Sequence, residues 1–128
     1  MDEAGLVERA LKIPGLNNSD ATQLSRGRLT NCDFLVGVGA SSLHVSVRNG
    51  RVESLERGPL LMRSWRFAIR GEAEAWEKFW RPVPPPEFHD IFALAKRGAF
   101  VIEGDWLPLM SSLLFYKGLL ALPRRLEG

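Results

Sequence analysis

The sequence predicts an α+β fold with five strands, four of them early in the chain and one among the helices that follow. Between residues 34 and 70, apolar and polar residues alternate with the period of two that a half-buried strand requires. From residue 72 on, apolar residues recur with the period of roughly 3.6 of an amphipathic helix, interrupted by one short strand-like run. A block of strands followed by helices is typical of an α+β layer architecture.

The N-terminal region predicts one short helix followed by a loop. Residues 2–12 place apolar residues at helical spacing, and Pro14-Gly15 is expected to end that helix. Residues 16–30 are rich in Asn, Ser, Asp and Gly, which favour irregular structure. We therefore expect a loop there, with at most a short helical turn.

The first four strands are expected at residues 34–39, 43–48, 51–56 and 64–70. Asn49-Gly50 is a strong signal for a two-residue turn, because both residues tolerate positive φ. Short connections of this kind predict that the strands pair as antiparallel hairpins. In the fourth strand, Trp65, Phe67 and Ile69 face one way and form an apolar face, whereas the alternate positions suit solvent.

Three further helices are expected at residues 72–81, 88–96 and 106–122. The proline-rich residues 82–86 form a rigid connector between the first two. A short strand at residues 99–103 follows a helical crossover, which makes it a candidate for parallel pairing with an earlier strand. Asp105 is expected to cap the N-terminus of the last helix.

The last helix has almost no polar face. A sheet can cover only one side of such a helix, so its other side must meet another helix, a ligand, a partner chain or a membrane. A membrane-spanning helix needs about 20 apolar residues. This run is shorter, contains Lys117 and ends at Pro123, which favours a buried or pocket-covering helix.

The order of these elements resembles the sterol carrier protein-2 superfamily over residues 30–122. Three short motifs carry the resemblance: a strand entering an Asn-Gly turn, a strand end of the form I-x-G before a helix, and a strand of the form G-x-x-x-I-E-G-D. In this chain they are Val47-Arg48-Asn49-Gly50, Ile69-Arg70-Gly71-Glu72, and Gly98-Ala99-Phe100-Val101-Ile102-Glu103-Gly104-Asp105.

The resemblance implies a five-stranded, mostly antiparallel sheet with helices packed on one face. It also implies an apolar tunnel between sheet and helices that holds acyl chains, sterols or other lipids. On this basis residues 1–29 are an N-terminal helix and loop, residues 30–122 a lipid-binding domain and residues 123–128 a tail.

The residues available for chemistry argue against catalysis. His44 is expected at the surface, on the polar face of a strand. His89 and Asp90 are adjacent, so they would not face each other on a helix, and Asp90 is expected to cap that helix instead. Cys32 is the only cysteine, which excludes an internal disulfide and a cysteine zinc cluster, and its thiol is expected to be inert. We expect no catalytic residue, no metal and no cofactor.

The overall composition favours a cytoplasmic protein that does not bind nucleic acid. Lys and Arg total 17 and Asp and Glu total 15, and the bases are scattered rather than concentrated in a stripe. The acidic N-terminus lacks the pattern of a signal peptide, and the lone cysteine suits a reducing compartment.

The leading hypothesis is binding, and transfer, of a lipid or other hydrophobic ligand in a tunnel under the C-terminal helix. Met62 and Met110 are candidate adaptable linings, because thioethers fit irregular shapes. The alternative is a non-catalytic interaction module that homodimerises through this helix, with a core filled by aromatic rings. Membrane contact would be peripheral at most, and an enzyme using His89 or Glu103 as a base would need a polar cleft. The expected ligand-lining residues are Trp65, Phe67, Ile69, Trp76, Phe79, Phe92, Met110, Leu114 and Phe115.

Overall fold

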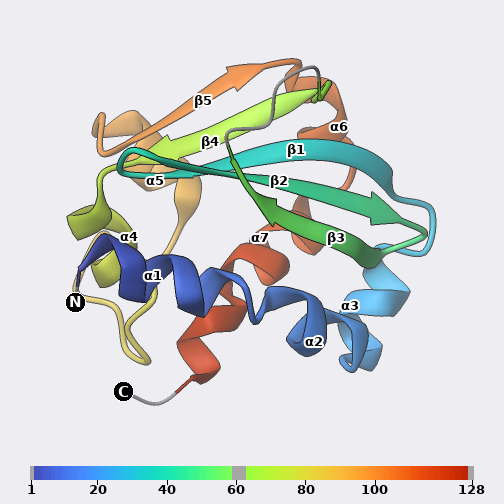
Figure 1. Cartoon of the computed structure of the whole chain (residues 1–128), viewed down its shortest axis with the longest axis horizontal. Coiled ribbons are helices and arrows are strands. Elements are labelled where there is room, and N and C mark those ends of the chain that lie inside the picture. The colour runs from blue at the N-terminus through green and yellow to red at the C-terminus, as the bar shows by residue number, and fades with distance from the viewer. Residues whose placement is uncertain (1, 59–62, 127–128) are drawn as a thin grey trace.

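A five-stranded sheet forms one layer of the molecule and helices form the other (Figure 1). The computed structural model describes residues 2–58 and 63–126. The strand order across the sheet is β3-β2-β1-β4-β5. The strands are β1 (Asn31–Val38), β2 (Ser41–Arg48), β3 (Arg51–Arg57), β4 (Phe67–Gly71) and β5 (Phe100–Gly104). The predicted α+β class with a mostly antiparallel sheet is confirmed.

The one parallel pair joins β1 and β4, in the register Phe34 opposite Phe67 and Val36 opposite Ile69. The other three pairs are antiparallel, including β4 with β5. The expectation that β4 continues a hairpin series was therefore wrong, and β5 is not the parallel strand. The chain leaves β3 at one edge of the sheet and re-enters on the far side of β1, so β1 lies at the centre.

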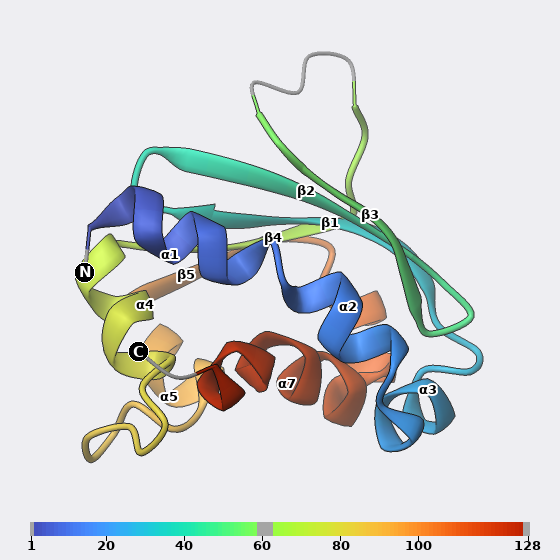
Figure 2. The same cartoon turned by 60° about the horizontal axis from the view of Figure 1, so that its bottom comes forward.

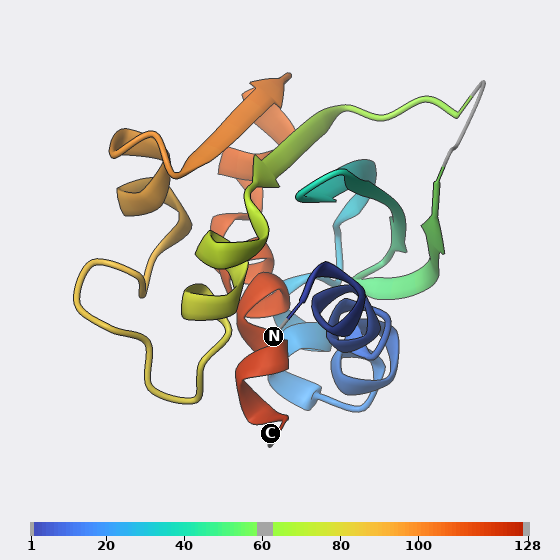
Figure 3. The ribbon, with the colours of Figure 1, turned by 60° about the vertical axis from the view of Figure 1, so that its left-hand side comes forward.

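Figure 2 shows α1, α2, α3, α4 and α7 beneath one face of the sheet, as the resemblance implied. In Figure 3, α4 and α7 lie side by side on that face. The helices are α1 (Glu3–Ala10), α2 (Ile13–Asn18), α3 (Ala21–Arg26), α4 (Ala73–Phe79), α5 (Ile91–Lys96), α6 (Trp106–Ser111) and α7 (Leu113–Ala121), and a 3-10 turn (Leu122–Arg125) follows.

The segment expected to be a loop contains α2 and α3 instead. Pro14 lies in the first turn of α2 rather than ending a helix, which is tolerated because a first-turn residue has no helical N–H bond to lose. Asn17 donates through Nδ2 to the carbonyl of Gly50 at 2.8 Å. Asn18 exchanges two hydrogen bonds with the backbone of Val52. Asp20 caps α3. The polar residues that suggested a loop thus dock and cap short helices.

The Asn49-Gly50 turn is confirmed, since both residues have positive φ (53° and 80°). The single terminal helix is wrong, because the chain breaks at Ser112 (φ −129°, ψ 41°) into α6 and α7. Thr30 donates through its hydroxyl to that of Ser112 at 2.8 Å and fixes the break. Asp105 caps α6 as expected, accepting from the backbone N–H of Leu107.

Aromatic rings fill the space between the sheet and α7. Phe34 and Phe67 stack at 5.0 Å, and Tyr116 of α7 meets both rings edge-on at 5.3 and 5.2 Å. Trp76 of α4 and Trp80, which follows the last residue of α4, extend this packing, with their ring centroids 4.8 Å apart. Apolar residues of α1 belong to the same core, so residues 1–29 and 30–122 are packed together.

Gly118 lies where α3 crosses α7. A Cβ there would collide with Oε1 of the buried Gln23, whose Nε2 donates to the Phe115 carbonyl at 3.0 Å and to Oδ1 of Asn17 at 3.2 Å. A Cβ added at Gly15, in α2, would meet no atom within 4 Å. The two helical glycines therefore differ in whether the surrounding residues leave room for a side chain.

We predict opposite effects of the same substitution at these two sites. Gly15→Ala should stabilise the fold by about 0.5–1 kcal/mol through helix propensity and a less flexible unfolded chain. Gly118→Ala should destabilise it by about 1–3 kcal/mol, because Gln23 must give up buried hydrogen bonds. Urea unfolding measures both, and stabilisation by Gly118→Ala would show that Gln23 moves aside at no cost.

Candidate functional site

The nine residues expected to line a tunnel do not meet around one cavity in the described residues. Five of them are buried together in the aromatic core, where their side chains fill the space beneath α7. The other four lie apart: Trp65 lines a polar hollow, Met110 and Leu114 are exposed on α6 and α7, and Phe92 is half-buried on α5. The five core residues are Phe67, Ile69, Trp76, Phe79 and Phe115. Met62, the other candidate lining methionine, lies outside the described residues.

An apolar hollow of about 420 Å³ lies instead at the edge of the sheet, between α5, β5 and α6. We call it the edge groove. Its walls carry the rings of Phe92 and Trp106, whose centroids are 6.0 Å apart at 57°. It is lined by Phe92, Ala95, Lys96, Gly98, Phe100, Val101, Ile102 and Trp106.

The position of β5 as an edge strand creates this groove. Only β4 pairs with it, so its other side is open to α5 and α6. Gly104 ends β5 with φ +90°, a conformation that favours glycine, and the N–H of Asp105 then bonds the Arg66 carbonyl at 2.8 Å. This turn starts α6 at the edge of β5 and places Trp106 opposite Phe92.

The rim of the edge groove carries positive charge. Lys96 is exposed, and no carboxylate among residues 2–58 and 63–126 forms an ion pair with it. Lys117 lies with its Nζ 5.4 Å from the Phe92 ring and pairs with Asp90 at 3.1 Å. Asp90 therefore binds Lys117 rather than capping α5 with its side chain, which corrects the expected role.

A second, polar hollow of about 400 Å³ lies on the opposite face of the sheet, near Asp33, Arg48 and Trp65. Burial alone would raise the pKa of Asp33, but hydrogen bonds from Ser46 and Arg48 outweigh it and hold the pKa below its usual value. The polar groups at this site are thus paired with one another.

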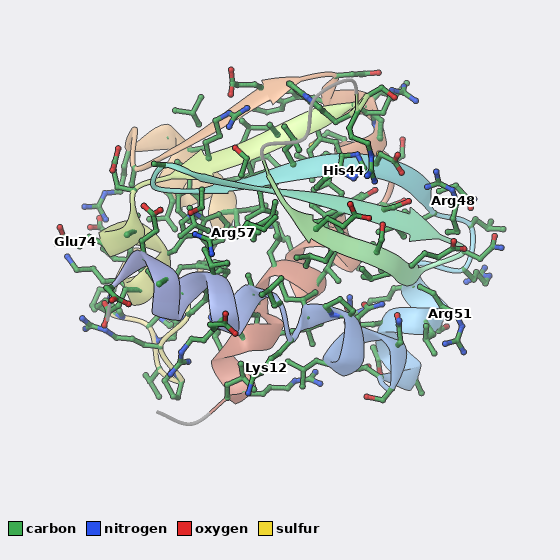
Figure 4. All side chains as sticks on the ribbon, viewed as in Figure 1. Lys12, His44, Arg48, Arg51, Arg57 and Glu74 are labelled. Carbon is green, nitrogen blue, oxygen red and sulfur yellow. The ribbon has the colours of Figure 1, made fainter. Side chains whose placement is uncertain are left out.

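His44 is buried beside this hollow and is not a surface residue, contrary to expectation. In Figure 4 it lies along β2, on the strand that ends at Arg48. Its Nε2 lies 3.0 Å from the Ser64 carbonyl and its Nδ1 3.2 Å from the Arg63 guanidinium. A carbonyl needs a donor and a guanidinium needs an acceptor, so these partners fit a neutral ring protonated on Nε2. Both nitrogens are therefore engaged.

Cys32 and Tyr116 are neighbours on the helical side of the sheet. Burial raises the pKa of the Cys32 thiol, which fits the expected inert cysteine. Burial also raises the pKa of Tyr116, and the adjacent thiol adds to that shift. The Tyr116 hydroxyl has no hydrogen-bond partner among the described residues.

The described part of the chain contains neither a candidate metal site nor a candidate membrane span. No group of three or more His, Cys, Asp or Glu side chains there is arranged to hold a metal ion. None of its helices is both long and apolar enough to cross a bilayer. The edge groove offers apolar contact, three aromatic rings and, at its rim, Lys96 without an ion pair among the described residues.

Neither a family model nor a curated protein matches the chain by sequence. Comparison with solved structures gives a different result. A crystal structure of sterol carrier protein 2 superimposes with a TM-score of 0.73, covering 94% of this chain and 96% of the other, at 11% sequence identity. The chain has the sterol carrier protein-2 fold.

Two further structures share this sterol carrier protein-2 fold. A conserved hypothetical protein from Thermus thermophilus, described as a possible sterol carrier protein, gives a TM-score of 0.66 at 9% identity over 91% of this chain and 85% of that one. A UbiJ-SCP2 ubiquinone synthesis protein gives 0.57 at 18% identity over 98% and 93%. The resemblance seen in the sequence motifs is confirmed for the fold.

Tyr116→Phe tests whether the buried hydroxyl is unpaired. We predict that the variant is more stable by about 1 kcal/mol, since the ring packing stays and a buried group without a partner is removed. Urea unfolding measures the change. A loss of stability would show that the hydroxyl is bonded, and a double-mutant cycle with Cys32→Ala would test the nearest candidate partner.

Proposed function

We propose that the protein is a non-catalytic carrier that binds a lipid or another hydrophobic small molecule in the edge groove. One observation carries the proposal: an apolar groove with two opposed rings is open to solvent on a sterol carrier protein-2 fold. Small-molecule sites are typically hollows of about 300–1,000 Å³ lined by apolar and aromatic side chains with few polar groups. The edge groove has this size and this lining.

The rings beneath α7 direct the ligand to the edge of the sheet. Phe100 belongs to the floor of the groove, and its ring packs on Trp76 at 4.4 Å. A longer tunnel toward α7 would require Phe100 to move. In this proposal the ligand lies against Phe92 and Trp106 first, and any deeper part of the site opens by displacement of Phe100.

The charges of the groove fit holding a ligand rather than converting it. Among the described residues that line it, Lys96 is the one titratable side chain. General acid–base catalysis needs groups positioned on the reacting atoms, commonly in pairs. A single cation at the rim suits instead the polar or acidic end of an amphiphile, with its apolar part inside. If the ligand enters and leaves through the solvent-exposed mouth of the edge groove, the protein can also transfer it from one membrane or protein to another.

A matched pair of tryptophan variants tests the site. Trp106 is 44% exposed in the edge groove, and Trp65 is 37% exposed in the lining of the polar hollow near Asp33 and Arg48. Trp106→Ala should weaken binding of cis-parinaric acid by about tenfold or more, the effect of losing one buried ring. Trp65→Ala should leave binding unchanged. Fluorescence titration measures both, with palmitate and cholesterol as competitors.

The proposal fails if the unmodified protein binds no probe, or if Trp65→Ala weakens binding as much as Trp106→Ala. A second candidate, an interaction module that homodimerises, is favoured by the filled core and by exposed Leu107 and Leu114. Sedimentation velocity separates the two. A concentration-dependent dimer together with no probe binding would support the module.

A further inference from the structure

Large apolar side chains stand out from α6 and the first turn of α7. Leu107 is 69% exposed and Leu114 is 65% exposed, and Met110 lies exposed between them in sequence. Exposed apolar residues that occur singly need no explanation, but several that follow one another on two consecutive helices indicate an interaction site. We call these three residues the apolar ridge.

Two hollows flank the apolar ridge. The edge groove begins at Trp106, the first residue of α6. A second hollow of about 240 Å³ lies along α7, and Leu114 belongs to its wall together with Arg26, Lys117 and Arg124. Lys117 lies over the ring of Phe92, so the two hollows adjoin at these two side chains.

Charges around the apolar ridge are mainly positive. Among the described residues, the bases that line the two hollows are Arg26, Lys96, Lys117 and Arg124, and the one acid is Asp90. Asp90 is already paired with Lys117. The next acid along the chain, Asp105 at the start of α6, is paired with Arg66 at 2.7 Å, and this arginine holds the pKa of Asp105 below its usual value. Arg26 and Lys96 are exposed and form no ion pair among the described residues, whereas the half-buried Arg124 donates to the carbonyls of Phe79 and His89. The charge next to the ridge is therefore net positive.

We infer that this surface docks on an anionic lipid membrane. The apolar ridge enters the interfacial region while the surrounding bases remain at the level of the anionic headgroups. Trp106, half-exposed at the end of the ridge, has the amphipathic ring that is enriched at that level. Docking in this orientation brings the mouth of the edge groove to the bilayer.

Lysine argues for a membrane rather than a protein partner. Protein interfaces are enriched in aromatic residues and depleted in lysine, whereas Lys and Arg around apolar anchors are typical of membrane-surface contacts. Here two of the four bases are lysines, and Leu107 and Met110 are exposed outside both hollows. The inference does not depend on the proposed ligand, because the ridge and its bases exist without one.

Vesicle flotation tests the docking without any ligand. The vesicles are phosphatidylcholine alone or with phosphatidylglycerol, at low and at physiological salt. The protein should bind the anionic vesicles more tightly, and salt should weaken that binding because the attraction is screened. The double variant Leu107→Ser with Leu114→Ser should bind about tenfold more weakly or worse, since two exposed anchors are lost.

Charge variants separate the two contributions. Arg26→Gln with Lys96→Gln should lower binding to anionic vesicles by about fivefold for each charge removed, and should hardly change binding to phosphatidylcholine. Matched controls come from α1 and from the end of β3 far from Arg26: Leu11→Ser just after α1, and Lys12→Gln with Arg57→Gln, the last two residues being labelled in Figure 4. These control side chains are exposed, so folding should be retained, and circular dichroism checks it for every variant.

Three results would overturn the inference. The first is no flotation of the unmodified protein with anionic vesicles at low salt. The second is equal loss of binding in the control variants. The third is a dimer in sedimentation velocity that Leu107→Ser converts to a monomer, because the apolar ridge would then belong to a second copy of the chain. Loss of vesicle binding with intact parinaric acid binding would leave the carrier proposal standing, so the two failures are distinguishable.

Discussion

The ring packing between the sheet and α7 is the interaction on which the rest of the structure depends. Phe34 and Phe67 belong to the parallel strands β1 and β4, and Tyr116 closes on both from α7. Aromatic pairs of this geometry add about 0.5–1.5 kcal/mol each beyond the area they bury. The indole of Trp76 bonds the Gly37 carbonyl of β1 and that of Trp80 bonds the Leu120 carbonyl of α7. Rings and indole N–H groups together therefore fix the helical layer on the sheet.

A centre filled in this way moves the binding surfaces to the periphery. The ring of Phe100 closes the path from β5 to Trp76, which leaves apolar space only outside it, in the edge groove. The break at Ser112 turns α6 away from the direction of α7 and exposes its apolar residues. An edge strand normally needs protection from other chains, and charged pairs such as Arg70 with Glu103 supply it on one face of β5. The edge groove and the apolar ridge thus both lie outside a core that aromatic rings already fill.

Local signals in the sequence were sufficient for much of the fold and insufficient for the site. The Asn49-Gly50 turn and the Asp105 cap depend on residues close in the chain, so pattern alone located them. Parallel pairing of β4 depends on which strand it meets, and the break at Ser112 depends on a hydroxyl 82 residues away. His44 became a buried residue because residues 63–65 cover it, which alternation cannot reveal. Sequence patterns predicted which residues form apolar faces, but not which aromatic side chains would be exposed to solvent at the edge of the sheet.

The late position of α7 has a consequence for how the chain is made. During synthesis the N-terminal elements emerge first, at about 5–20 residues per second. All five strands leave the ribosome before Tyr116, Leu119 and Leu120, the side chains that cover them. The side-chain amide of Gln23 gains its acceptor, the Phe115 carbonyl, only when the chain is 92 residues longer. The nascent sheet consequently presents a bare aromatic face for about 1–2 seconds after β5 is made. That face is a natural substrate for chaperones, and a chain that stalls or is truncated at this point is most prone to aggregate.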